Sequence, residues 1–226
     1  MIHQSPAMAT ERFELEKTGK VTWEVKTDEK MVSITFDDGP NPLYTPEILD
    51  VLARHNAKAT FFVVGSHALK YPEIIRREVL EGHEIANHTF HHLHIIRDTE
   101  KLEQEIVQTS EALKEITGFS PTLFRPVGGS YNKHIINTAA ENGHHVVLWS
   151  WHQDTKDWRN PGVQAITNRV IKGIKPGNII LFHDSGGNRS QTIKALDKIL
   201  TILENDGYEF VTVSELIFRS QTNQDN

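Results

Sequence analysis

Residues 31–41, MVSITFDDGPN, decide the fold of this 226-residue chain. The run from Met31 to Phe36 is apolar and rich in β-branched residues, which predicts a buried strand, and two carboxylates and a Gly-Pro turn follow it at once. Similar runs recur as ATFFVV (59–64), HHVVLW (144–149), NIILF (178–182) and YEFVTV (208–213). Near-continuous apolar strands of this length are typical of a parallel sheet that is buried on both faces.

Amphipathic stretches of helical length separate these runs, which predicts repeated β–α units and an α/β domain. Thr45-Pro46 predicts one helix start, with Thr45 as the N-cap. Several predicted helices end in a glycine shortly before the next strand, at Gly82, Gly118, Gly143 and Gly207. The pattern leaves open whether the sheet closes into a barrel or stays open and doubly wound.

The domain organisation is simple, because no repeat and no linker divides residues 21–218. Residues 1–20 form a short N-terminal extension that could be flexible, and VTWEVK (21–26) could add an accessory strand. The polar residues 219–226 are expected to be a flexible tail.

Composition excludes several classes of protein. The formal net charge is −6, so a nucleic-acid or anionic membrane partner is not expected. No apolar run approaches the roughly 20 residues of a membrane span, and no export signal is visible at the start. Cysteine is absent, so any metal must be bound by carboxylates and by some of the 13 histidines.

Reactive groups of parallel α/β folds gather at the carboxyl ends of the strands. Asp37 and Asp38 follow the first strand, and two neighbouring carboxylates in a buried site need a cation or a division of labour. An acidic turn that caps the next helix is the alternative interpretation.

His88 and His92 follow the strand EIAN (84–87) and would share one face if this segment is helical. Two imidazoles at that spacing can bind one divalent ion together with a carboxylate from elsewhere. Solvated surface histidines are the alternative, and we interpret His91 and His94 as bystanders.

Three further strand ends carry candidate groups: Arg125, the pair Asp154 and Asp157, and His183. Arginine beside a carboxylate lowers the pKa of that carboxylate, and a histidine with a carboxylate partner can act as a general acid. Each residue alone could be structural. A parallel fold, however, would bring all five strand ends to one rim.

Five stretches in this order resemble the motifs of the polysaccharide deacetylase family: TFDDGP (35–40), HTFHH (88–92), FRPVGG (124–129), DTKDW (154–158) and ILFHD (180–184). This family is also called the NodB-homology domain or carbohydrate esterase family four, and the resemblance covers about residues 31–215. It implies an α/β fold, a single-domain distorted (β/α) barrel of seven strands, with residues 21–218 as the catalytic domain. It also implies a divalent ion, most often zinc, with cobalt, nickel or manganese as alternatives.

The resemblance implies a role for each matching residue. Asp38, His88 and His92 would bind the metal, Asp37 would be the catalytic base, and Arg125 would orient Asp37.

By the same resemblance, His183 would be the general acid and Asp157 would hold it in its productive state. Trp158 would line the sugar groove, and Leu181 would form part of the pocket for the acetyl methyl group.

The third motif departs from its family. Many members carry Arg-Pro-Pro-Tyr-Gly, whereas this chain has Val127 and Gly128 in place of Pro and Tyr. The backbone N–H at Gly128 would still serve as the oxyanion donor, but an aromatic groove wall is lost. Tyr131 could replace that wall, so the departure affects substrate preference more than chemistry.

We therefore predict a monomeric metal-dependent hydrolase that removes N-acetyl groups from N-acetylglucosamine units of peptidoglycan or chitin-like polysaccharide. Such a substrate implies an extracellular or cell-wall location. The alternatives are an O-acetyl esterase on xylan, an amide hydrolase on a small non-sugar substrate, and a non-catalytic glycan-binding module.

Overall fold

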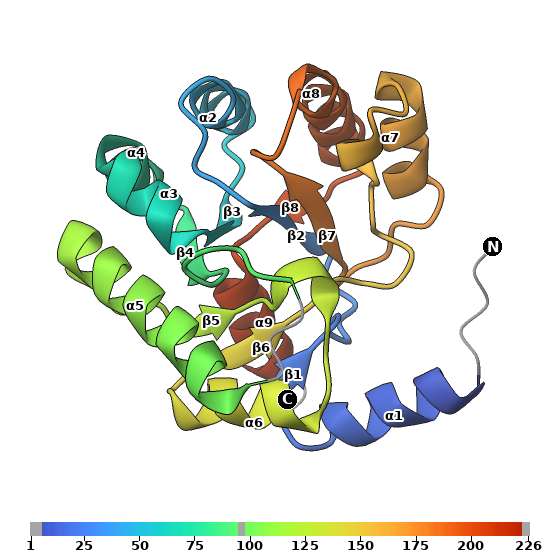
Figure 1. The fold of residues 1–226 in the computed structure, drawn as a ribbon. Helices are drawn as coiled ribbons and strands as arrows, with labels where there is room; N and C mark the ends of the chain where they lie inside the picture. Colours follow the sequence, from blue (N-terminus) through green and yellow to red (C-terminus); the bar gives the residue numbers. More distant parts are fainter. Residues whose placement is uncertain (1–5, 95–97, 223–226) are drawn as a thin grey trace.

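Parallel strands at the centre of the molecule are surrounded by helices (Figure 1). The computed structural model describes residues 6–94 and 98–222. Seven strands follow one another in the sheet: β1 (Val21–Thr22), β6 (His145–Val147), β5 (Leu123–Phe124), β4 (Glu84–Asn87), β3 (Ala59–Val63), β2 (Met31–Asp37) and β7 (Ile179–His183). A further strand, β8 (Glu209–Phe210), pairs with β2, and every strand pairing is parallel. This arrangement confirms the predicted α/β fold and its accessory strand at residue 21.

The strand order begins with β1 and ends with β7. The barrel is distorted between these two strands. The irregular segment 150–155 runs along β7 there. Ser150 N donates to Ile179 O at 3.0 Å, and Leu181 N donates to Gln153 O at 3.0 Å. This segment occupies the edge of β7 with which a further strand would pair in a closed barrel.

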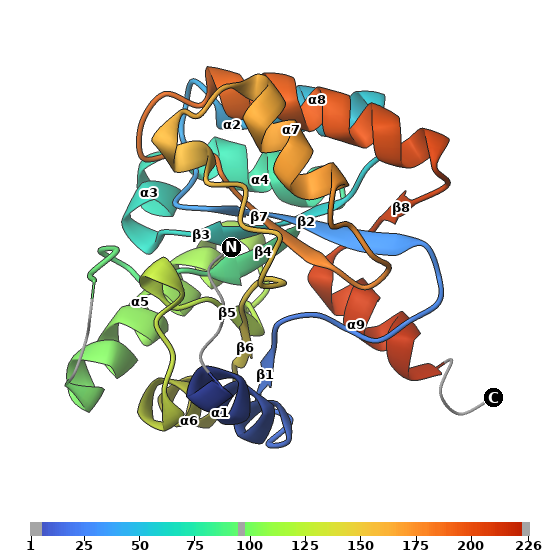
Figure 2. The same ribbon diagram turned by 90° about the vertical axis from the view of Figure 1, so that its right-hand side faces the viewer.

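The helices pack outside the strands, as Figures 1 and 2 show from two sides, except for α9 (Val213–Thr222), which lies at one end of the barrel. They are α1 (Pro6–Glu16), α2 (Thr45–Arg54), α3 (Gly65–Lys70), α4 (Pro72–Leu80), α5 (Thr99–Thr117), α6 (Lys133–Glu141), α7 (Val163–Ile171), α8 (Ser190–Asn205) and α9 (Val213–Thr222). Two short 3-10 turns, η1 (Val127–Gly129) and η2 (Asp157–Arg159), follow β5 and β6. Across the described parts of the chain, no helix combines the length and apolarity needed to cross a bilayer.

Strand β2 is buried on both faces, which explains its near-continuous apolar sequence. Met31 packs inside the barrel with Phe62, and residues of α9 belong to the same interior cluster. Ile34 and Phe36 belong to the outer cluster that includes residues of α2 and α8. Because side chains alternate along a strand, Asp37 shares the interior face with Met31 and lies at the opposite, carboxyl end of the strand.

The N-terminal extension contains a helix that the sequence analysis missed. Leu15 of α1 is only 2% exposed and lies in a core cluster with Trp23. Arg12 donates to Glu24 at 3.0 Å and lies over the Trp23 ring. These contacts of Arg12 and Leu15 attach the helix to the domain.

The C-terminal tail also differs from the expectation of flexibility from residue 219. Helix α9 continues to Thr222, and Arg219 donates to Glu209 at 2.9 Å and to Glu29 at 2.7 Å. These charge-assisted bonds explain why the helix extends past residue 218. Residues 1–5 and 223–226 lie outside the described part of the chain.

Candidate active site

The general base and acid expected from the sequence are neighbours in the sheet. Asp37 ends β2 and His183 ends β7, and the register of these two parallel strands pairs Asp37 with His183. Neighbouring residues of parallel strands project to the same face, so both side chains lie on the interior side at one rim.

Arg125 fixes the orientation of Asp37 from inside the barrel. Its Nη1 donates to Asp37 Oδ1 at 2.7 Å and to Thr35 Oγ1 at 2.8 Å. Its Nε and Nη2 donate to the carbonyls of Val147 and the next residue, and its guanidinium lies 3.9 Å from the centre of the Phe62 ring. Arg125 has no exposed surface, so the buried negative charge of Asp37 is matched by an equally buried positive one.

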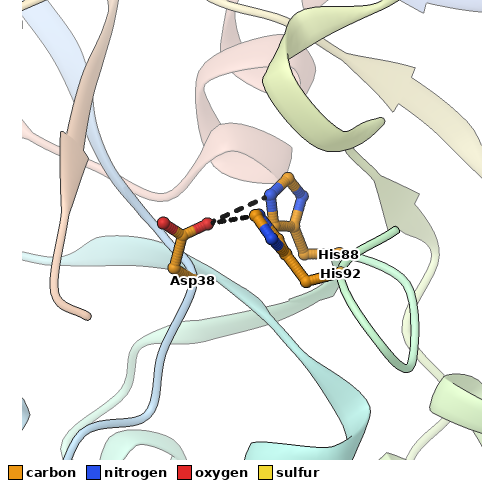
Figure 3. Close-up of side chains that lie close together, drawn as sticks. All are labelled: Asp38, His88 and His92. Atoms are coloured by element: carbon orange, nitrogen blue, oxygen red, sulfur yellow. Dashed lines mark ion pairs between the residues drawn. The ribbon is translucent and has the colours of Figure 1, made fainter. Parts of the chain in front are cut away.

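Asp38, His88 and His92 converge on one point, as Figure 3 shows. Asp38 Oδ1 lies 2.9 Å from His92 Nε2 and 3.5 Å from His88 Nε2. Although burial opposes ionisation, hydrogen bonds with the two histidines hold the pKa of Asp38 below its usual value. Within residues 6–94 and 98–222, this is the one group of three or more histidine, aspartate or glutamate side chains close enough to share a metal ion.

The donor set fits a divalent transition ion. The three candidate ligand atoms lie within 4.8 Å of one another. His88 Nδ1 is 2.7 Å from the carbonyl oxygen of Arg125, and because a carbonyl only accepts, Nδ1 must carry the proton. The proton on Nδ1 leaves Nε2, which faces Asp38 at 3.5 Å, as the nitrogen that would bind a metal once it gives up its own proton.

The segment that carries the two histidines is not helical, so the condition for a shared helical face is not met. Thr89 and His92 have φ of 67° and 56°, which interrupts any helix. Gly65 N and Ser66 N donate to the carbonyls of Thr89 and the residue after it, both at 3.0 Å. These bonds to α3 replace the intrahelical ones, yet the two imidazole rings still meet with their centres 5.3 Å apart.

His183 is held by Asp157, which begins η2. His183 Nδ1 donates to Asp157 Oδ1 at 2.8 Å, and the His183 backbone N–H donates to Oδ2 at 3.0 Å. Thr192 Oγ1 donates to the same Oδ2 at 2.8 Å. Burial lowers the pKa of His183, but Asp157, with Asp37 and Asp38, outweighs this and raises the pKa to about 9. The imidazole is therefore protonated at neutral pH and can donate a proton.

Two predicted groove residues lie close in sequence to Asp157 and His183. Trp158 follows Asp157 in η2 and is 46% exposed, so its ring is available at the surface. Leu181 precedes His183 by two residues on β7 and is buried on the same interior face.

The loop with the unusual third motif shows what its glycines do. Gly128 and Gly129 have φ of 63° and 67°, and a Cβ on Gly129 would stand 2.4 Å from Trp149. A Cβ on Gly128 would meet His94 Nδ1 at 3.8 Å. Gly129 is thus required by close packing, whereas Gly128 borders on His94, which the sequence analysis interpreted as a bystander.

Tyr131 packs on the N-terminal part of the domain. Its ring packs edge-on against the buried Trp23, with 5.1 Å between ring centres. Tyr131 and Val127 both line an apolar cavity of about 390 Å³ beside Thr89. The suggestion that Tyr131 replaces the lost aromatic wall stays a prediction.

Sequence reasoning missed buried carboxyl groups beside the site. Asp184 accepts from Thr45 Oγ1 at 2.5 Å, so Thr45 binds this carboxyl instead of capping α2. Burial raises the pKa of Asp184 to about 7.

Glu105 is also fully buried, on α5 between Leu102 and Ile106. A charged residue among apolar core positions of a helix is the signal that could have identified Glu105.

Comparisons with known proteins identify the family of this chain. The family model described as polysaccharide deacetylase matches residues 24–147. A peptidoglycan-N-acetylglucosamine deacetylase of Bacillus cereus (strain ATCC 14579) is 51% identical over 207 residues, which cover 91% of this chain and 97% of that relative. A chitooligosaccharide deacetylase of Bradyrhizobium sp. (strain ANU 289) is 37% identical over 200 residues, which cover 83% of this chain and 90% of the relative.

Solved structures give the same result. The crystal structure of a peptidoglycan N-acetylglucosamine deacetylase superposes with a TM-score of 0.86 at 35% identity, and the match covers 90% of this chain and 95% of that one. The predicted resemblance is confirmed, and the chain belongs to the polysaccharide deacetylase family.

Proposed function

We propose that this protein hydrolyses the N-acetyl groups of N-acetylglucosamine units in peptidoglycan. The observation that carries the proposal is the pairing of Asp37 with His183 at one rim, each held by a buried partner. A carboxylate base and an imidazolium acid side by side are what hydrolysis of an unactivated amide requires. The names of the relatives point to peptidoglycan first and to chitin oligosaccharides second.

Asp38, His88 and His92 are the residues that we propose to hold the divalent ion, with zinc the foremost candidate and cobalt, nickel or manganese as alternatives. Such an ion supplies Lewis acidity, which lowers the pKa of water and polarises an amide carbonyl.

Asp37 is the proposed base. Its Oδ1 is occupied by Arg125, whereas its Oδ2 is the oxygen that lies 3.9 Å from His88 Nε2, on the side of the three ligands. Oδ2 is therefore positioned to take the proton from the attacking water. Arg125 holds Oδ1 in place, which leaves Oδ2 free to point toward the three proposed ligands.

His183 is the proposed acid. Because Nδ1 is bound to Asp157, the proton for the departing sugar amine comes from Nε2. The amine would be too poor a leaving group without this proton. The Gly128 N–H is the proposed donor to the developing oxyanion, a contribution of roughly 3–4 kcal/mol for one good donor.

Substrate contacts are proposed from exposure and position. Trp158 offers an exposed ring for a sugar, and Leu181 lies below His183, where an acetyl methyl group would be placed. Tyr131 remains a candidate for the wall of the groove near Gly128. The proposed polymer places the protein at the cell wall, and we retain the prediction of a monomer.

Acetate release from three substrates tests the proposal. Purified protein is incubated with peptidoglycan, N-acetylglucosamine oligomers and acetylated xylan, with and without added zinc, cobalt, nickel or manganese. We expect release from peptidoglycan with metal present. Release from xylan alone would favour the esterase, and binding of glycan without any release would favour the non-catalytic module.

A further inference from the structure

We propose that Glu105 of α5 is a positioning residue that holds the backbone between His88 and His92 in the conformation that binds metal. This inference rests on the metal site proposed above. It assigns a function to a residue that lies outside the five motifs, on a helix that contributes no predicted ligand.

Glu105 binds the backbone of the histidine segment directly. Its Oε2 accepts from the backbone N–H groups of Phe90 at 2.9 Å and His91 at 2.7 Å. Its Oε1 accepts from His91 Nδ1 at 2.8 Å and is 3.4 Å from Lys101 Nζ. The carboxylate has no exposed surface, so these bonds do not compete with bulk water.

The segment needs such support because its backbone is strained. Thr89 and His92 both adopt the left-handed region, which costs a residue other than glycine of the order of 1 kcal/mol or more. The surrounding structure must therefore enforce this conformation. Asn87 Oδ1 accepts from Thr89 N at 2.9 Å, and α3 binds the carbonyls. Glu105 accepts hydrogen bonds from the two backbone amides between the strained residues.

The consequence falls mainly on His92. His88 is fixed independently, because its Nδ1 donates to the Arg125 carbonyl and its side chain is almost fully buried. The His92 side chain is 30% exposed, and its backbone directly follows the two amides bound by Glu105. Without Glu105, His92 would lose the geometry that places its Nε2 2.9 Å from Asp38 Oδ1.

Metal affinity is the measurement that separates this role from general stabilisation. Metal-free wild type, Glu105→Met and Glu105→Gln are titrated with zinc against a chromogenic chelator, and cobalt spectra report the ligand geometry. We expect the Kd for zinc to rise about 10–100-fold in Glu105→Met, as for other residues that orient metal ligands. Glu105→Gln keeps one oxygen acceptor for the amides and should show a smaller rise.

Lys101→Met is the matched control, because Lys101 Nζ pairs with Oε1 of Glu105, whereas the backbone amides of the histidine segment bind Oε2. Its zinc Kd should equal that of the wild type. Activity of Glu105→Met should recover in excess zinc, whereas a residue that took part in the chemistry would give no such recovery.

Two results would overturn the inference. If wild type binds zinc and both Glu105 variants bind it with the same Kd and cobalt spectrum, Glu105 does not position the ligands, even if the variants melt earlier. If Glu105→Met fails to fold, Glu105→Gln decides by the same comparison. A wild type that binds no zinc would instead overturn the proposed metal site together with this inference.

Discussion

The two halves of the candidate site are built in different ways. The strand-borne half consists of Asp37, Arg125 and His183, which stand at or directly after strand ends. The loop-borne half is the segment His88–His92, which has no regular secondary structure. Sheet register places the first half, whereas side-chain hydrogen bonds from other elements place the second.

This difference shows which part of the site depends on its surroundings. A strand end moves only if the ladder moves, so the proton-transfer residues inherit the rigidity of the sheet. The loop-borne half keeps two left-handed residues only while neighbouring helices bind its backbone. We therefore expect perturbations of the two halves to have separable effects on chemistry, metal binding and stability.

The largest effect is expected from removal of the metal. A strong chelator should reduce acetate release to background, and added zinc should restore it, because two of the three proposed ligands lie in the loop-borne half. Far-UV circular dichroism should stay unchanged, since the barrel does not depend on that segment. Activity that persists after complete removal of metal, measured by elemental analysis, would contradict the metal assignment.

Asp37→Asn should separate base chemistry from metal binding. The amide keeps the size of the side chain but cannot take a proton, so kcat should fall at least about 100-fold, within the range for general bases. The Kd for zinc should change only slightly, because Asp38 and not Asp37 belongs to the proposed ligand group. Full activity in this variant would show that another group is the base.

Arg125→Met should destabilise the strand-borne half by about 3–5 kcal/mol, because it leaves Asp37 buried without its partner. Urea unfolding with a linear extrapolation measures this loss. Arg54→Met is the matched control. Arg54 pairs with Asp197 at the surface, 57% and 47% exposed, so its loss should cost under about 1 kcal/mol. Equal losses in the two variants would mean that burial of the Asp37 pair has no special importance.

Asp157→Asn should give a smaller and pH-dependent effect. The raised pKa of His183, about 9, means that the folded protein binds this proton more tightly than the unfolded chain. The resulting stabilisation is complete below about pH 6.5 and disappears as pH rises toward 9. In metal-free protein, the stability difference between wild type and Asp157→Asn should therefore be larger at pH 6 than at pH 9.

The activity profile offers a second measurement of the same change. The alkaline limb of kcat/KM should move to lower pH in Asp157→Asn, because burial lowers the pKa of His183 once its carboxylate partner is gone. An alkaline limb that stays in place would show that Asp157 does not set the protonation of His183.

The two halves of the site also differ in how far the sequence predicts their structure. The apolar run of β2 and the acidic residues after it could be assigned without coordinates, because a strand buried on both faces has a distinct local pattern. Whether the segment after His88 is helical could not be predicted, because residues on α3 and α5, far away in sequence, bind its backbone. No local pattern reports such bonds.

The small elements at the ends of the chain were the other failure. Helix α1 is attached through Leu15 and Arg12, and neither residue alone predicts a packed helix. Short helices of this kind are stabilised by tertiary contacts more than by propensity.

The sequence by itself determined the fold class, the family and the identity of the residues at the strand ends, because periodicity and motif order are local properties of the chain. Only the tertiary structure decided that Asp37 faces His183, that Arg125 reaches Asp37 through the barrel interior, and that Glu105 binds the histidine segment. These contacts join residues that are many positions apart, and their geometry follows from sheet register and packing. The barrel therefore converts a series of separated polar residues into one site.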